Sequence, residues 1–398
     1  MNLILFDDPS IRQDLSPFTL TRPISEIRVG ILTITGKWEI AFNCKASFHT
    51  ADYLSSKYPT KSTADNVLVN GAVCPDAALV KAILSLKNEE AIAKSGILIA
   101  AKTHSTSFDN INVKEYENEI TLVDQVWKIF QFNAAQIKLD FDLITKGRKS
   151  NALNDSHTIL YGELGKDIFL EEGAIIKAAV LNAENGPIYI GRNAQVQEGA
   201  LIRGPFALCE GAHVNMGAKI RGDSTIGPFS KVGGEISNSV IFGFSNKGHD
   251  GFLGNSVVGE WCNLGADTNT SNLKNNYENV KIWNYKKGGF KDTGLQFCGL
   301  IMGDHSKCGI NTMFNTGTVV GVGCNIFGDG FPRTFIPSFA WGGAAGFTTF
   351  QLNKMLDTAE KVYERRNKRL EEVDKEILQR LFQSTEGNRV WEKKTVKE

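Results

Sequence analysis

The sequence predicts an α/β domain, then a parallel β-helix, then a C-terminal amphipathic helix. Short apolar runs alternate with helical patterns over roughly the first 145 residues, which is typical of layered α/β domains. A six-residue repeat dominates the second half, and helical periodicity returns over residues 350–382. We expect domains at 1–148, 156–340 and 350–384, with the polar segment 146–155 as a linker.

In the N-terminal domain, apolar runs beside turn residues predict buried strands at Leu3–Phe6, Asn66–Gly71 and Gly96–Ala101. Helical spacing of apolar residues predicts one helix over 76–87 and another over 121–144. Strands that alternate with helices in this way favour a layered α/β fold.

The six-residue repeat places aliphatic side chains in one register without a slip and then resumes after a gap. Its positions are Ile190, Val196, Ile202, Leu208, Val214, Ile220, Ile226 and Val232, then Met302, Cys308, Phe314, Val320 and Ile326. Most are followed four residues later by Ala, Ser, Thr or Cys. This period suits neither an amphipathic helix nor an alternating strand, and it is the signature of a parallel β-helix. A glycine-rich region with accidental spacing is the alternative, and eight consecutive hits argue against it.

Residues 237–252 and 267–294 do not fit the repeat. In a solenoid such interruptions become loops on one face, often the binding face, so we expect the chemistry there. The C-terminal helix, or pair of helices, has a charged face of mixed sign. Packing on the solenoid end or on a neighbouring subunit is therefore favoured over contact with a membrane.

Charge and composition narrow the class of protein. The 398 residues hold 44 basic and 44 acidic side chains, so no global basic field favours nucleic acid or an anionic membrane. No apolar run approaches the roughly eighteen residues of a transmembrane helix, and the first residues lack a signal-peptide pattern. Seven cysteines without a CxxC pair indicate reduced thiols and no zinc ribbon. We expect a cytoplasmic protein without nucleic-acid or membrane partners.

The densest polar cluster is residues 245–251, and His249 is its only histidine. A neutral imidazole in such a glycine-flanked segment can act as a general base near pH 7. The alternative is a surface histidine without a role.

The hexads and the run KGHDGFLGNSVVGEWCNLGADTNTSN, from Lys247 to Asn272, carry a resemblance. They resemble the acetyltransferase half of the bacterial bifunctional uridyltransferase/acetyltransferase family that makes UDP-N-acetylglucosamine. With LSPFTLTRPISEIRVGILT and FPRTFIPSFAWGGAAGFTT included, the chain is more similar to the shorter Bacteroidetes-type sugar nucleotidyltransferase branch. The resemblance implies a left-handed β-helix, a homotrimer, and acetyl-CoA bound between subunits.

The resemblance also implies roles for particular residues. His249 matches the base that takes a proton from the sugar amine, and Ala266, Asp304 and Val322 match coenzyme contacts. Substrate contacts are implied for Arg221, which suits a sugar phosphate, and for Asn263, Asn272 and Lys247. Turn-forming asparagine is the alternative for Asn263 and Asn272.

Three positions depart from the family. Ser237 stands in place of a phosphate-binding lysine, for which Lys247 is one candidate substitute. Leu273 replaces a loop tyrosine, and Phe252 falls near another tyrosine. Each lost polar group costs on the order of 1 kcal/mol of binding, which leaves the acceptor sugar open.

The N-terminal domain departs further. A nucleotidyltransferase needs a glycine-rich loop, a basic residue on the phosphates and a carboxylate for Mg²⁺. The usual GxGTR loop is absent after the first strand, while Arg22, Arg28 and Lys37 are the candidate nucleotide-binding residues. Ala72 stands where the metal aspartate belongs, so Asp76 is the candidate metal ligand.

Three functions remain open. The first is acetyl transfer from acetyl-CoA to glucosamine-1-phosphate, coupled to Mg²⁺-dependent transfer from a nucleoside triphosphate to give UDP-N-acetylglucosamine. The second is acetyl transfer alone, or to another amino sugar, with a degenerate nucleotide-binding domain. The third is a non-catalytic β-helix scaffold.

Overall fold

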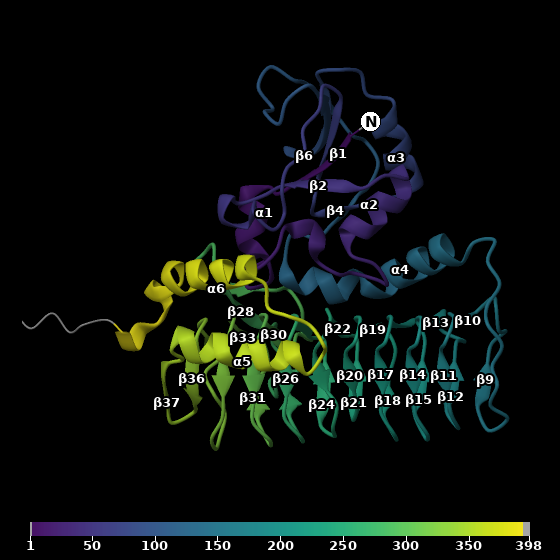
Figure 1. Ribbon diagram of the computed structural model, residues 1–398, viewed down its shortest axis with the longest axis vertical. Coiled ribbons are helices and arrows are strands. Elements are labelled where there is room, and N and C mark those ends of the chain that lie inside the picture. Colours follow the sequence, from purple (N-terminus) through teal and green to yellow (C-terminus); the bar gives the residue numbers. More distant parts are fainter. Residues whose placement is uncertain (1, 393–398) are drawn as a thin grey trace, which may run out of the picture. The chain divides into compact units, whose positions relative to one another are not determined.

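The computed structural model describes residues 2–392 (Figure 1). By their contacts these residues form two compact units. The first holds the residues up to Arg28 together with Leu32–Val126, and the second holds Val29–Ile31 and the described residues from Trp127 onward.

The first unit is built on a mixed six-stranded sheet. In spatial order its strands are β2 Ala46–His49, β1 Asn2–Phe6, β3 Asn66–Asn70, β6 Ile97–Thr103, β5 Glu90–Lys94 and β7 Asn112–Glu115. A small antiparallel pair joins β4 Val73–Cys74 to β8 Thr121–Leu122. The helices are α1 Pro9–Asp14, α2 Ile34–Phe42 and α3 Ala77–Leu84, with short 3₁₀ turns at Phe18–Leu20, Ile24–Glu26 and Asp52–Leu54. The three predicted strands and the helix predicted over 76–87 are confirmed.

The second unit is a three-sided β-solenoid. Its first sheet contains β10 Ile168–Leu170, β13 Ile188–Ile190, β16 Phe206–Leu208, β19 Ser224–Ile226, β22 Val240–Ile241, β25 Val257–Val258, β30 Ile301–Met302, β33 Val319–Val320 and β35 Phe335–Ile336. Its second sheet contains β11 Ile175–Ile176, β14 Gln195–Val196, β17 His213–Val214, β20 Lys231–Val232, β23 Asn246–Lys247, β26 Asn263–Leu264, β31 Lys307–Cys308, β34 Asn325–Ile326, β36 Ala340–Gly343 and β37 Gly346–Thr349. Its third sheet contains β9 Ile159–Tyr161, β12 Val180–Asn182, β15 Leu201–Arg203, β18 Lys219–Ile220, β21 Glu235–Ser237 and β24 Phe252–Gly254, and the pair β27 Asn269–Thr270 with β32 Met313–Phe314 lies beyond them in sequence.

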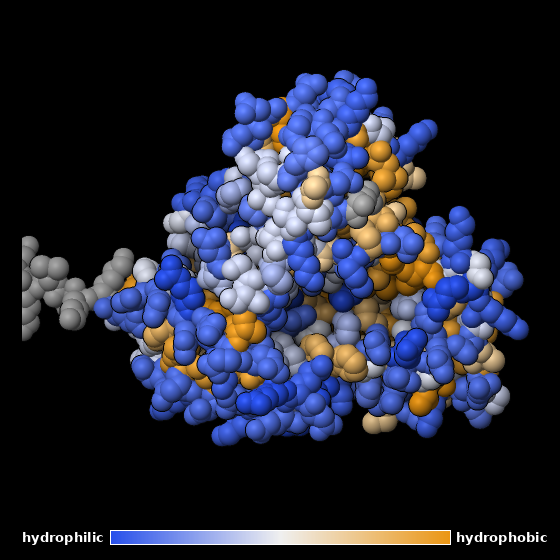
Figure 2. Space-filling view, turned by 45° about the horizontal axis from the view of Figure 1, so that its top comes forward, coloured by the Kyte–Doolittle hydropathy of each residue, from blue (hydrophilic) through white to orange (hydrophobic). Residues whose placement is uncertain are grey.

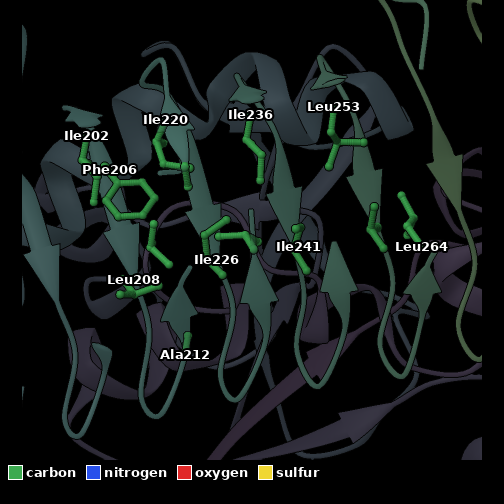
Figure 3. Packing of buried hydrophobic residues seen from close by; sticks show 14 of the residues in the cluster. Ile202, Phe206, Leu208, Ala212, Ile220, Ile226, Ile236, Ile241, Leu253 and Leu264 are labelled. Atoms are coloured by element: carbon green, nitrogen blue, oxygen red, sulfur yellow. The ribbon is translucent and has the colours of Figure 1, made fainter. Parts of the chain in front are cut away.

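Each coil passes through the three sheets in turn, and strands of successive coils pair in parallel. The aliphatic positions of the repeat point into the interior, as the cluster in Figure 3 shows for Ile202, Ile220 and Leu208. Ala194 and Ala212, at the small positions, are fully buried, because a larger side chain would not fit the narrow interior. The predicted β-helix is therefore confirmed, and its core is built from the inward side chains of all three sheets.

The predicted interruption at 237–252 is wrong. These residues form β22, β23 and the start of β24 in regular coils, because the repeat slips in register while the strands still pair. The interruption at 267–294 is confirmed, since the antiparallel hairpin β28 Lys281–Asn284 with β29 Gly289–Asp292 is inserted between β27 and β30.

Three helices pack on the solenoid. The helix predicted over 121–144 is α4 Val126–Thr145, and it begins later because 121–122 belong to β8. It lies along the early coils (Figure 1). Its apolar face covers them, and Phe141 contacts Phe169 there. The C-terminal pattern forms two helices, α5 Leu352–Glu364 and α6 Glu372–Ser384, followed by 3₁₀ turns at Glu386–Asn388 and Val390–Glu392.

Helix α5 lies against an aromatic column at the turns between the first and second sheets. Phe229, Phe244 and Trp261 stack in successive coils, and the α5 residue Tyr363 stacks on Trp261 with ring centroids 3.8 Å apart. Phe229, Phe244 and Trp261 each have a positive φ, near 50–60°, a backbone conformation that is rare for bulky residues. This column fixes where α5 crosses the coils.

No helix within residues 2–392 is long and apolar enough to cross a bilayer. The surface seen in Figure 2 is mostly hydrophilic, with apolar side chains gathered in separate patches.

Candidate functional site

His249 lies in the short turn of residues 248–251 between β23 and β24, which we call the His249 turn. The turn rests on the preceding coil, where a Cβ on Gly233 would lie 2.4 Å from the carbonyl oxygen of Gly248. Only glycine permits so close an approach of two backbones. Asn215, one coil earlier still, donates its Nδ2 hydrogen to the same carbonyl at 2.7 Å. The backbone of the turn is therefore held from below while the His249 side chain is exposed.

His249 lines a cavity of about 690 Å³ between the second sheet and α5, which we call the α5 groove. Its walls carry four cationic side chains (Lys231, Lys307, Arg365 and Arg366), the aromatic rings of Phe244 and Trp261, and the amides of Asn215, Asn246 and Asn263. No acidic side chain is among the described residues that line it. A groove that combines cations, aromatic faces and amides suits a phosphate-bearing ligand with an apolar or heterocyclic part.

Burial opposes the charge of two of these cations. Desolvation lowers the pKa of Lys307, and the ammonium donates to the carbonyl of His305 at 3.0 Å. Desolvation and the neighbouring Arg365 lower the pKa of Arg366, whose Nη2 donates to Asn246 Oδ1 at 3.0 Å. Because like charges are held close together and partly dehydrated, an anionic ligand would relieve the cost of keeping them there.

A second cavity, of about 780 Å³, shares His249, Asn215, Lys231 and Ala266 with the α5 groove. We call it the open groove. It differs by its carboxylates, Asp250 and Asp267, and by Gln197 and His213. Burial, followed by the charges of Lys231 and Arg366, lowers the pKa of His213 and so favours its neutral form. His249 thus stands where a cationic groove meets a mixed-charge groove.

Two further predicted site residues lie beside His249. Asn263 and Ala266 both line the α5 groove, on β26 and the turn that follows it. Arg221 and Asn272 do not. Both follow the carboxyl ends of third-sheet strands, whereas His249 precedes the amino end of β24, so they lie at the other end of these short strands. There Arg221 Nη1 pairs with Glu235 Oε1 at 3.1 Å, and Asn272 Nδ2 donates to Asn255 Oδ1 at 2.8 Å.

Three other predicted contacts are inside the solenoid. Lys247 is 1% exposed and lies in the inward column of the second sheet, so its side chain does not reach either groove. Asp304 is buried, and its Oδ1 accepts from the backbone N–H of Glu260 at 2.9 Å. Val322 is fully buried. For Asp304 and Val322 only the backbone remains for a coenzyme.

In the first unit the predicted nucleotide-binding residues are also largely enclosed. Arg22 and Lys37 are buried, and Arg28 is half-buried. Asp76 is the N-cap of α3 and accepts from the N–H of Leu79 at 2.8 Å, which explains its presence without a metal. Within residues 2–392 no cluster of three or more His, Cys, Asp or Glu side chains is arranged to hold a metal. The residues present do not form a ready Mg²⁺ site, and we derive no step through one.

Sequence reasoning missed most of the groove. Lys231 and Lys307 each precede an inward position of the repeat, so their outward direction was readable from the hexads. Asn246 precedes Lys247, a position that the aliphatic pattern does not mark. Arg365 and Arg366 could not be found in this way, because nothing in the repeat says which coils α5 crosses.

The model of a family described as sugar nucleotidyl transferase matches residues 3–149. The bifunctional protein GlmU of Methanocaldococcus jannaschii is 36% identical over 90 residues, 23% of this chain and 21% of that protein. GlmU of Synechococcus elongatus is 22% identical over 334 residues, 80% of this chain and 68% of that protein. The chain is a distant relative of the GlmU group.

These matches, with the β-solenoid, support a transferase of the sugar nucleotidyl or acetyl transfer type. The alignment spans about a fifth of the first of these relatives and about two thirds of the second, so the activities of the whole GlmU protein are proposals for this chain. Among solved structures, UDP-N-acetylglucosamine acyltransferase from Campylobacter jejuni covers 54% of this chain and 94% of its own, at 15% identity and a TM-score of 0.24. A likeness that low has no bearing on function.

Proposed function

We propose that the solenoid transfers an acetyl group from acetyl-CoA to the amine of an amino-sugar phosphate, with glucosamine-1-phosphate as the first candidate acceptor. The observation that carries the proposal is an exposed histidine at the junction of two grooves of different charge. The cationic α5 groove suits the phosphates of the coenzyme, and the open groove, with Asp250 and Asp267, suits an ammonium-bearing sugar.

In this reaction the sugar nitrogen attacks the thioester carbonyl. A C–N bond forms, the C–S bond breaks, and the coenzyme leaves as its thiol. The nitrogen must lose a proton, and His249 accepts it as general base because no other histidine lines both grooves in the part of the chain described. Asn263 and the backbone of Ala266 provide hydrogen bonds for substrate and coenzyme beside it.

The test is release of thiol from acetyl-CoA with glucosamine-1-phosphate and no nucleotide. His249→Ala should lower kcat by about 10²–10⁴-fold, because it removes the base. The melting temperature should not change, since the side chain is exposed. His157→Ala, which removes another exposed histidine of the same unit, is the matched control and should behave as wild type. Wild-type turnover in His249→Ala would remove the base assignment.

A second activity is favoured by the family match over residues 3–149. We propose that the first unit transfers a uridylyl group from UTP to the acetylated sugar phosphate, with release of pyrophosphate. Pyrophosphate release that requires N-acetylglucosamine-1-phosphate would support this step. Thiol release in the first assay without pyrophosphate release in this one would leave acetyl transfer as the sole activity.

We further propose a homotrimer. Arg221 and Asn272 match substrate contacts of the resembled family, yet in one chain they lie at the other strand ends from His249. A neighbouring copy could supply these residues to the His249 side of the next. Light scattering should give three times the mass of the 398-residue chain, and a monomer with full thiol-release activity would contradict the shared site.

A further inference from the structure

The inward column of the second sheet contains one charged residue. Along successive coils it is made of Ile176, Val196, Val214, Val232, Lys247, Leu264, Cys308 and Ile326. Every other member is an apolar side chain or a thiol, and Lys247 is as buried as they are, at 1% exposure. Placing an ammonium in such a column costs free energy unless its donors are satisfied.

The ammonium of Lys247 is satisfied by the His249 turn. Its Nζ donates to the carbonyl oxygen of His249 at 2.5 Å and to that of Asp250 at 2.7 Å. Both acceptors are backbone atoms of the two residues that reverse the chain at the groove. The lysine side chain therefore lies inside the solenoid and is hydrogen-bonded from there to the backbone of the turn.

The charges around the ammonium are few. Asp250, Cys308 and Asp267 favour its protonated form, while burial opposes it and is the larger effect, lowering the pKa of Lys247 to about 8. At neutral pH the side chain is therefore mostly protonated and can make both charge-assisted hydrogen bonds. A methionine would fill the same space without the desolvation cost, so packing alone does not explain the choice of lysine.

We propose that Lys247 is a positioning residue that holds the His249 turn from within the β-helix. The consequence for turnover rests on the proposed acetyl transfer, whereas the consequence for the turn does not. The sequence suggested that Lys247 binds substrate, but a side chain that is enclosed and bonded to two carbonyls acts on the substrate only through His249.

The experiment compares Lys247→Met with Ile326→Met, which places a methionine in the same column further along the solenoid, at a position that lines neither groove. Hydrogen exchange is measured by mass spectrometry on the segment that contains residues 248–251, and kcat and KM are measured by thiol release. If the methionine variant does not fold, the second variant is Lys247→Val, which places at this position the residue type found at Val232 in the preceding coil.

In Lys247→Met we expect at least 10-fold faster exchange in the turn and a fall in kcat of about 10- to 100-fold, because a small displacement of a base is costly. The KM for acetyl-CoA should stay within about 2-fold, since the side chain does not line the α5 groove. Ile326→Met should leave exchange in the turn and kcat unchanged.

Unchanged exchange in Lys247→Met would overturn the proposal. Faster exchange with wild-type kcat would overturn the claim that Lys247 supports turnover, because loosening the turn would then have no effect on the reaction. If wild type itself releases no thiol, the proposed function fails, and faster exchange in Lys247→Met would still establish that the lysine holds the turn.

Discussion

Polar clusters follow the strands β1 and β23, and their side chains have opposite roles. After β1, the side chain of Asp7 is 4% exposed and bonds to Arg12, to Thr50 and to the N–H of Ile24, so its oxygens serve the first unit itself. After β23, the backbone of the turn is bonded from below and the His249 side chain is left exposed. The difference teaches that a polar motif is a candidate site only where the fold has satisfied the backbone and left the side chain available.

The largest expected change in the free energy of unfolding comes from the cluster around Asp7. Arg12→Met should destabilise the first unit by about 3–5 kcal/mol, because it leaves the buried Asp7 carboxylate without its cation. Arg12 also donates to Tyr53 Oη at 2.9 Å, and this bond is lost as well. The measurement is denaturant unfolding, followed for each variant by a signal from the unit that carries the substitution.

The matched control is Arg221→Met, which removes the exposed pair with Glu235. Its cost should be about 0–1 kcal/mol, as for other exposed ion pairs. Equal losses of unfolding free energy in Arg12→Met and Arg221→Met would mean that burial does not make the Asp7 cluster more important for stability. That result would contradict the comparison.

The next effect concerns Lys247 and pH. Its pKa is lowered to about 8 in the folded chain from an ordinary value of 10.5, so between these values the unfolded chain binds more protons. Wild-type stability should therefore rise with pH from 8 to 10.5, relative to Lys247→Met, by about 2 kcal/mol. Unfolding curves of both proteins at pH 7, 8, 9 and 10 test this, and a constant difference across the series would contradict the buried charge.

The smallest effect tests the α5 groove. Arg366→Gln should raise the KM for acetyl-CoA by about 10-fold, equivalent to about 1.4 kcal/mol, and leave kcat nearly unchanged, because the side chain lines the groove without serving as the base. Added salt should reduce the difference in the KM for acetyl-CoA between Arg366→Gln and wild type, because it screens the charge of Arg366. A fall in kcat with constant KM would instead place Arg366 at the reacting atoms.

The solenoid was predictable because its geometry repeats. Inward aliphatic side chains such as Ile190 and Val214 recur every six residues, and their burial follows from the period alone. The regular coils at 237–252 were missed because the spacing of inward residues shortens from six at Ile236 and Ile241, and because Lys247 then occupies an inward position. A column read from hydrophobicity cannot recognise a charged member that the backbone satisfies.

The site was predictable only in part. His249, Asn263 and Ala266 meet in one groove, as a local run of sequence allows. The partners contributed by α5 depend on how Tyr363 stacks on Trp261, a contact between residues about 100 positions apart that no local pattern encodes. For the same reason, the burial of Asp304 and Val322 was visible only in the folded chain.

The hairpin formed by β28 and β29 shows what this architecture tolerates. Each coil pairs only with the coil before it and the coil after it, so stability accumulates neighbour by neighbour. An insertion that leaves and rejoins between β27 and β30 interrupts one coil and leaves the pairing of β25 with β30 and of β26 with β31 intact. Evolution can therefore lengthen, shorten or replace that hairpin, and so change the surface that it presents to ligands or partners. The coil that carries His249 keeps its strand pairing throughout.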